Sequence, residues 1–338
     1  MRHDHIEFHN TAELEESRSF GGVKLYRFPR EVRHALGDRG RFISEEATGC
    51  ELRFVTEAAH VRLTLLLPDR AGEVYVYRGG LLHSTHAMPA GIPKTLHLER
   101  PVRLAGMDLE KLTACGFAPE VWRVVFGRSE GVFLEWNTFG EAVRPPQAGE
   151  TPGVRLLAYG SSITHGLGTY PLTYIDQAAR RLKADLFNKG MSGSCLCEPE
   201  MADYLSRSEG WDAALLELGV NMRDHFPPDV FAERTDYLLR RMLERHPDKP
   251  FFLVTVYPNF ATWADSEAGR REREYNRILA GHVSRMASPN LHLIPGDEIL
   301  QDLSGLSCDM IHPGPYGHMQ MGEQLAIRMQ PVWEERFA

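Results

Sequence analysis

From residue 154 onward, short apolar segments of strand length alternate with longer segments whose apolar residues recur at helical spacing. The strand-like segments cover residues 154–159, 184–189, 212–218, 250–257 and 290–295. Phe231, Leu238 and Met242 share one face of a predicted helix, and residues 272–286 are charged enough for an exposed helix. Because strands joined through helices pair in parallel, we predict an α/β fold with helices on both faces of a parallel sheet.

The first 148 residues have a different pattern. Short β-prone runs, separated by turn residues, cover 51–55, 61–65, 74–77, 95–98, 121–126 and 132–136. Many short strands at this spacing are typical of an antiparallel β-sandwich. A proline- and glycine-rich bridge at residues 145–153 can supply few ladder hydrogen bonds. We therefore expect a jelly-roll-like β-sandwich accessory domain at residues 1–148 and the α/β domain at residues 149–338.

The composition limits the classes of partner. Hydrophobic residues make up 43% of the 338 residues and charged residues 25%, as in ordinary globular proteins. The net charge of −8 gives no basic surface for nucleic acid, and no apolar run is long enough to cross a membrane. The first residues lack a signal-peptide core, and five dispersed cysteines argue against a disulfide framework. We expect a cytoplasmic protein, without nucleic-acid or membrane partners, whose cysteines are small buried thiols.

A serine motif in the first half has the wrong surroundings for catalysis. Residues 127–131 match the Gly-x-Ser-x-Gly turn that carries the nucleophile of α/β-hydrolases, but that turn must lead into a helix. Here a strand-like run follows at residues 132–136. We therefore predict that Ser129 lies in a hairpin turn.

Two serines follow the first strand-like segment of the α/β half. Gly160 ends the strand, and Ser161 and Ser162 lie in the turn before a helix-like segment at residues 170–184. Open α/β sheets place their chemistry at such turns, outside the carboxyl ends of the strands. The sequence Gly-Ser-Ser-Ile-Thr at residues 160–164 resembles the Gly-Asp-Ser-Ile-Thr block that opens the SGNH (GDSL-type) hydrolases. The resemblance makes Ser162 the nucleophile and puts neutral Ser161 where the family usually has an aspartate.

Two further blocks of the family follow the next strands in the same order. Gly193 closes a glycine-rich turn similar to the second block, and Asn221 closes a Gly-x-Asn sequence similar to the third. Met222 stands where the family often has an aspartate. The resemblance implies an oxyanion hole formed by the backbone N–H groups of Ser162 and Gly193 and by the side-chain amide of Asn221.

The block nearest the C-terminus supplies the base. The sequence Asp309-Met-Ile-His312-Pro is similar to the Asp-x-x-His-Pro block of the family in residue type, spacing and order. A carboxylate three residues before a histidine can accept the Nδ1–H of the imidazole and leave Nε2 facing a serine. The resemblance, which covers residue 154 to the C-terminus, therefore implies a Ser162–His312–Asp309 triad on a flavodoxin-like SGNH domain.

The expected activity is hydrolysis of a small O-acyl ester through an acyl-enzyme, because members of this family with a leading β-sandwich resemble esterases that remove acetyl groups from carbohydrates. His165, Tyr257 and Trp263 are predicted to contact the substrate, and no cofactor or metal is expected.

Two other functions remain open from the sequence. The enzyme could pass its acyl group to an alcohol in place of water, or the protein could bind glycans through its first domain and keep only a vestigial hydrolase domain. The sequence does not determine the oligomeric state.

Overall fold

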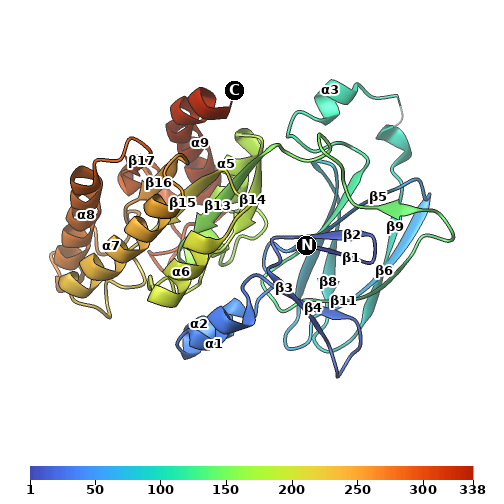
Figure 1. The fold of residues 1–338 in the computed structure, drawn as a ribbon, viewed down its shortest axis with the longest axis horizontal. Helices are drawn as coiled ribbons and strands as arrows, with labels where there is room; N and C mark the ends of the chain where they lie inside the picture. The colour runs from blue at the N-terminus through green and yellow to red at the C-terminus, as the bar shows by residue number, and fades with distance from the viewer. Residues whose placement is uncertain (105, 338) are drawn as a thin grey trace. The chain divides into compact units, whose positions relative to one another are not determined.

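The computed structural model describes residues 1–104 and 106–337, which form two compact units (Figure 1). The first unit contains residues 1–33 and 44–153, and the second contains residues 34–43 and 154–338. The predicted domains at residues 1–148 and 149–338 stay a prediction. The compact units depart from that division at residues 34–43, an early segment that packs with the later half of the chain.

The first unit is a sandwich of two antiparallel sheets, which confirms the predicted fold of this half. One sheet has the order β1 (Arg2–His3), β2 (Ile6–His9), β5 (Glu51–Thr56), β10 (Val121–Phe126), β7 (Gly72–Arg78) and β8 (Leu81–Met88), with β12 (Val143–Arg144) pairing with β5. The other has the order β3 (Glu13–Glu16), β4 (Val23–Tyr26), β11 (Val132–Asn137), β6 (His60–Leu66) and β9 (Lys94–Glu99). The helical segments in the first half of the chain are α1 (Arg30–Ala35), α2 (Asp38–Ser44), η1 (Val102–Leu104) and α3 (Leu109–Leu112).

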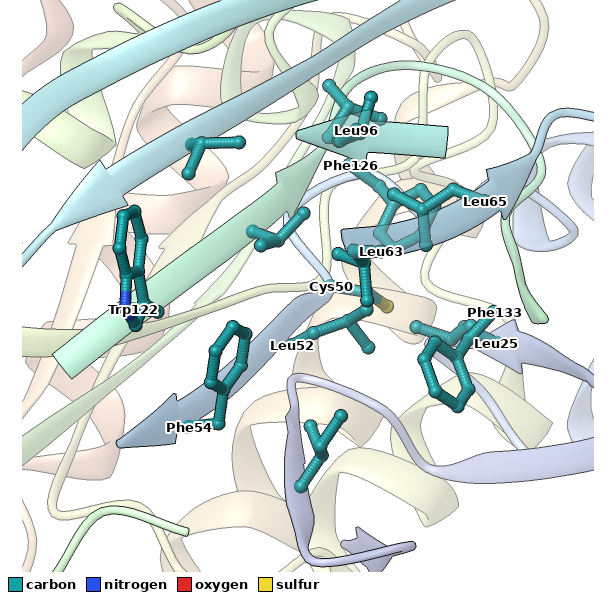
Figure 2. Packing of buried hydrophobic residues seen from close by; sticks show 14 of the residues in the cluster. Leu25, Cys50, Leu52, Phe54, Leu63, Leu65, Leu96, Trp122, Phe126 and Phe133 are labelled. Atoms are coloured by element: carbon teal, nitrogen blue, oxygen red, sulfur yellow. The ribbon is translucent and has the colours of Figure 1, made fainter. Parts of the chain in front are cut away.

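The core of the sandwich lies between its sheets. Leu52 and Phe54 of β5 alternate inward from one sheet, and Leu63 and Leu65 of β6 do so from the other, because successive side chains of a strand point to opposite faces. Figure 2 shows these side chains converging with the ring of Trp122. Each of the five is at most 2% exposed, so this unit has a hydrophobic core of its own.

The turn that carries Ser129 is not a hairpin, which corrects the prediction. Strands β10 and β11 on either side of it belong to different sheets and do not pair with each other. The turn is a crossing between sheets, and the Ser129 carbonyl accepts a hydrogen bond from the Ala47 N–H at 2.7 Å. The sequence shows that two strands flank the turn but not which strands each of them pairs with.

The second unit contains the predicted parallel sheet, in the order β14–β13–β15–β16–β17. Its strands are β13 (Val154–Tyr159), β14 (Ala184–Asn188), β15 (Ala213–Glu217), β16 (Phe251–Val254) and β17 (Leu291–Ile294), all paired in parallel. Its helices are α4 (Ser162–His165), α5 (Tyr174–Arg181), α6 (Pro199–Arg207), α7 (Pro228–Arg245), α8 (Glu267–Met286) and α9 (Pro315–Phe337), with 3₁₀ turns η2 (Gly296–Glu298) and η3 (Leu303–Gly305). The flavodoxin-like strand order and the predicted α/β class are both confirmed.

Helices cover both faces of this sheet (Figure 1). Helices α5 and α9 pack against each other and bury their apolar faces on Leu156 and Ala158 of β13 and on Leu215 of β15. Helix α7 packs between α6 and α8. The predicted helical face of Phe231, Leu238 and Met242 is fully buried, in agreement with its spacing.

The strand order places the turn after β13 beside the turn after β15. Strand β13 has β14 on one side and β15 on the other, so the order of the chain reverses at this point of the sheet. Tyr159 at the end of β13 pairs with Leu216 near the end of β15. The turns that follow these strands therefore leave the same edge of the sheet, where open α/β sheets bind their ligands.

Two further expectations concern membranes and cysteines. No helix among the described residues combines the length and apolarity needed to span a bilayer. All five cysteines are free thiols. The prediction of small buried thiols is right for Cys50, Cys195 and Cys197 and wrong for Cys308, which is exposed, while Cys115 is half-buried.

Candidate active site

The predicted nucleophile begins a short helix directly after β13. Ser161 caps α4, and its hydroxyl accepts a hydrogen bond from the Ile163 N–H at 3.2 Å. Ser162 is therefore the first residue of the helix. Its side chain is held by the turn, yet the residue keeps 5% of its surface exposed.

A buried carboxyl group accepts two hydrogen bonds from this turn. Glu217, the last residue of β15, accepts hydrogen bonds from the Ser161 N–H at 2.6 Å and from the Thr164 hydroxyl at 3.0 Å. Burial raises the pKa of Glu217 to about 7, although the hydrogen bonds from Ser161 and Thr164 act in the opposite direction. The acid that the family usually has beside the nucleophile is missing from the sequence at Ser161. The structure supplies a carboxyl group to the same turn from the neighbouring strand.

Replacing Glu217 by glutamine should change how stability depends on pH. In the unfolded chain this carboxyl titrates near 4.5, whereas in the folded protein it keeps its proton up to about pH 7. Native-state stability should therefore fall as pH rises through this window, by about 3 kcal/mol in total. Glu217→Gln lacks the titrating group and should not show this loss. Between pH 4.5 and 7 the unfolding free energy of the wild type should therefore fall by this amount relative to that of the variant. Denaturant unfolding across this range measures the difference, and parallel profiles for the two proteins would contradict the assignment.

The predicted base and its carboxylate lie in one tight turn before α9. Asp309 Oδ1 accepts hydrogen bonds from the backbone N–H groups of Ile311 and His312, at 2.9 and 2.8 Å. Met310 between them has a φ of +58°, in the left-handed region that a side chain rarely adopts. This conformation turns the chain sharply enough for the two N–H groups to converge on one oxygen.

The second oxygen of Asp309 orients the imidazole. His312 Nδ1 lies 2.7 Å from Asp309 Oδ2, and His312 Nε2 lies 2.7 Å from the hydroxyl of Ser162. Partial burial acts to raise the pKa of Asp309, but hydrogen bonds from His312, Ile311 and Ser307 outweigh it and hold the pKa well below its usual range. The carboxylate is therefore ionised and accepts the Nδ1–H of His312, which leaves Nε2 to accept from the serine hydroxyl. The structure thus brings together all three residues that the sequence predicted as a triad.

Gly193 is an exposed residue of the loop that follows β14. Its φ of +67° is in the left-handed region, and Met191 in the same loop donates its N–H to the Gly160 carbonyl at 2.8 Å. The loop is therefore attached to the turn that carries the serine. His165 is fully buried, and its Nδ1 lies 2.8 Å from the Ser192 hydroxyl. We propose a supporting role in this loop for His165 in place of the predicted substrate contact.

Asn221 follows β15 and is tied to the same loop. Its side-chain oxygen accepts a hydrogen bond from the Cys195 N–H at 3.1 Å. That bond fixes which end of the amide faces the loop and directs the NH₂ group to the other side. Asn221 is half-buried, so this donor is held in place without being covered completely.

The two aromatic residues predicted to contact substrate have different environments. Tyr257 is 2% exposed and packs edge-on against Tyr174, with ring centroids 5.6 Å apart, so it is a core residue. Its position after a strand is equally compatible with a pocket wall, so the sequence could not separate the two. Trp263 is 58% exposed on the loop after β16, and Phe260 of that loop donates its N–H to the Met310 carbonyl at 2.8 Å. A substrate contact by Trp263 therefore stays a prediction.

Residues 154–330 match the model of the GDSL-like lipase/acylhydrolase family. The match covers more than half of the chain, and the chain belongs to this family. Its second unit is accordingly an ester hydrolase domain of the SGNH type. A comparison with curated proteins gave no match.

Solved structures share the fold of nearly the whole chain. A salicylyl-acyltransferase, SsfX3, from a tetracycline biosynthetic pathway is 17% identical, with a TM-score of 0.80 over 97% of this chain and 95% of its own. A family two carbohydrate esterase from Clostridium thermocellum, in complex with cellohexaose, is 15% identical, with a TM-score of 0.68 over 97% and 99%. A putative GDSL-like lipase from Bacteroides ovatus is 16% identical, with a TM-score of 0.69 over 97% and 98%. These likenesses show the fold.

Proposed function

We propose that this chain is a serine esterase that removes small O-acyl groups, acetyl groups of carbohydrates in particular, through an acyl-enzyme. The observation that carries the proposal is the series of hydrogen bonds from Asp309 through His312 to Ser162, with 2.7 Å at each step. A hydroxyl, an imidazole and an ionised carboxylate in this order are the groups that acyl transfer through a serine requires.

In this mechanism Ser162 Oγ attacks the ester carbonyl carbon while its proton passes to His312 Nε2. The ionised carboxylate of Asp309 stabilises the imidazolium that forms. His312 then gives the proton to the leaving alcohol oxygen as the carbon–oxygen bond breaks, and the acyl group stays on Ser162. Water attacks the carbonyl carbon of the acyl-enzyme while His312 Nε2 accepts its proton, and His312 then returns that proton to Ser162 Oγ as the bond between the acyl carbon and Oγ breaks, which releases the acid and restores the serine.

The negative charge of each tetrahedral intermediate needs donors that are already in place. We assign this task to the N–H groups of Ser162 and Gly193 and to the amide NH₂ of Asn221. The hydrogen bond from Cys195 supports the assignment, since it holds the amide oxygen away and leaves the donor end for the substrate.

Asn221→Ala should lower kcat by about 10²- to 10³-fold with little change in KM, because the lost donor acts on the transition state. Steady-state kinetics with a p-nitrophenyl ester measures the change. Asn221→Asp provides a sharper comparison: it keeps the oxygen that accepts from Cys195 but places a carboxylate where the oxyanion forms. An aspartate variant with wild-type turnover would show that Asn221 only supports the loop.

The solved structures support both the substrate class and one rival function. The chain shares its fold with a carbohydrate esterase whose structure is in complex with cellohexaose, which favours an acylated carbohydrate. It also shares its fold with a salicylyl-acyltransferase, which favours transfer to an alcohol. The triad geometry serves either reaction, because water and an alcohol attack the same acyl-enzyme.

A panel of p-nitrophenyl esters of increasing acyl length and acetylated sugars distinguishes these functions. We expect acetyl esters to be cleaved fastest and acetate to appear in water. If a new ester forms when an acceptor alcohol is added, the enzyme is an acyltransferase. Glycan binding without turnover of any ester would instead favour the glycan-binding function and overturn the proposal.

A further inference from the structure

We propose that Arg39 binds a carboxylate of the ester substrate beside the candidate oxyanion site, which makes it a specificity-determining residue. This inference rests on the proposed function and deepens it by naming a charged class of substrate. It concerns a residue far from every motif of the α/β half in the sequence. Arg39 reaches the site because residues 34–43 belong to the second compact unit.

Close packing fixes helix α2 on the loop that carries Gly193. Leu36 and Ile43 are at most 2% exposed and anchor the segment at both ends. Between them Gly40 is buried, and a Cβ at this position would lie 2.9 Å from the Ser194 hydroxyl. A side chain at this position would have to displace the Ser194 hydroxyl, so helix α2 lies in close contact with the loop.

The guanidinium of Arg39 lies against the candidate oxyanion donor. Its Nε donates a hydrogen bond to the Ser192 carbonyl at 3.3 Å. The position that a Cβ would take on Gly193 lies 3.4 Å from Nε and 3.9 Å from one terminal nitrogen. An ester whose carbonyl oxygen is bound by the Gly193 N–H would therefore have its neighbouring substituents within reach of this cation.

The charge of Arg39 has no carboxylate partner among the described residues. Its guanidinium carbon lies 5.7 Å from the centroid of the Phe42 ring. By contrast, the buried Arg223 on another loop pairs with Glu272 at 2.7 Å. Arg39 and Gly193 are both exposed, so solvent and substrate can reach the terminal nitrogens. An exposed guanidinium with its orientation fixed by a backbone hydrogen bond suits the planar, two-oxygen geometry of a carboxylate.

Two matched pairs of esters test the proposal. In one pair, 4-acetoxybenzoate and its methyl ester, the carboxylate is on the leaving alcohol. In the other, p-nitrophenyl succinate and its methyl ester, it is on the acyl group. For at least one pair, Arg39→Gln should lower kcat/KM of the anionic member by about 10- to 100-fold, the range expected for one charge-assisted hydrogen bond. The neutral member should change by less than about threefold, because the glutamine amide can still donate to the Ser192 carbonyl.

Arg39→Lys is the charge-conserving control and should keep part of the preference for the anionic ester. Equal losses on both members of each pair, or a lysine variant as impaired as the glutamine variant, would overturn the proposal in favour of a structural role. Binding of the two anionic esters to the Ser162→Ala protein, with and without Arg39→Gln, gives a second readout that needs no turnover. Weaker binding of either anionic ester in the double variant would support Arg39 even if the proposed hydrolysis failed, and unchanged binding of both would overturn the proposal.

Discussion

Ser162→Ala should lower kcat of ester hydrolysis by about 10⁴- to 10⁶-fold, since the acyl-enzyme cannot form without the hydroxyl. The structure places this hydroxyl 2.7 Å from His312 Nε2, where its proton can pass directly to the base. His312→Ala should cost a similar factor, and the double variant little more than either single one, because the two groups act as a unit.

Ser129→Ala is the matched control for this prediction. Ser129 is the central residue of the Gly-x-Ser-x-Gly sequence, but it is buried in a crossing between the sheets of the sandwich. Its variant should retain wild-type kcat. A large loss in Ser129→Ala together with normal turnover in Ser162→Ala would reverse the assignment of the nucleophile.

Asp309→Asn should lower kcat by about 10²- to 10⁴-fold while the protein stays folded, because the substitution disturbs the tautomer of His312. One oxygen of Asp309 accepts two backbone N–H groups, and the other accepts the Nδ1–H of the imidazole. An amide has only one oxygen, so it cannot satisfy both sides. If its NH₂ faces the ring, Nδ1 becomes the acceptor and the proton moves to Nε2, which can then no longer accept from Ser162.

Asp302→Asn is the corresponding control in the neighbouring loop. Asp302 also accepts hydrogen bonds two residues ahead, from the backbone and hydroxyl of Ser304, and these bonds stay within its own turn. Kinetics of both variants at several pH values measure the effect. Equal and small losses in the two variants would mean that the Asp309 carboxylate is not needed to orient the base.

The parts of the site that the sequence predicted are those carried by short motifs. Ser162 and Asn221 come from distant parts of the chain, yet a parallel sheet brings the carboxyl ends of its strands to one edge, so the alternation of strands and helices predicts that these two lie near one another. His312 lies well beyond the end of β17, and its place beside Ser162 follows only from the resemblance of its motif to that of the SGNH hydrolases. The hydrogen bonds of Ser162 to His312 and of Asn221 to the Gly193 loop agree with these predictions.

Residues that act through packing or through a distant segment were not predictable in this way. Glu217 has a detectable signal, since it is an acid within an otherwise apolar strand, but its partners depend on the register between β13 and β15. Arg39 has no signal, because nothing in its local sequence indicates that α2 packs with the second unit. Strand β8 was not predicted either, because the His-Ser-Thr-His sequence in its middle lacks the apolar alternation that predicts a half-buried strand.

Covalent labelling with an organophosphorus ester, followed by peptide mass spectrometry, tests the central claim most directly. The reagent is attacked by an activated serine and leaves a stable phosphoryl group on its oxygen. We expect one adduct, on the peptide that contains Ser162, formed at a rate that drops sharply in His312→Ala. An adduct on a different residue, or full esterase activity in protein labelled completely at Ser162, would contradict the assignment.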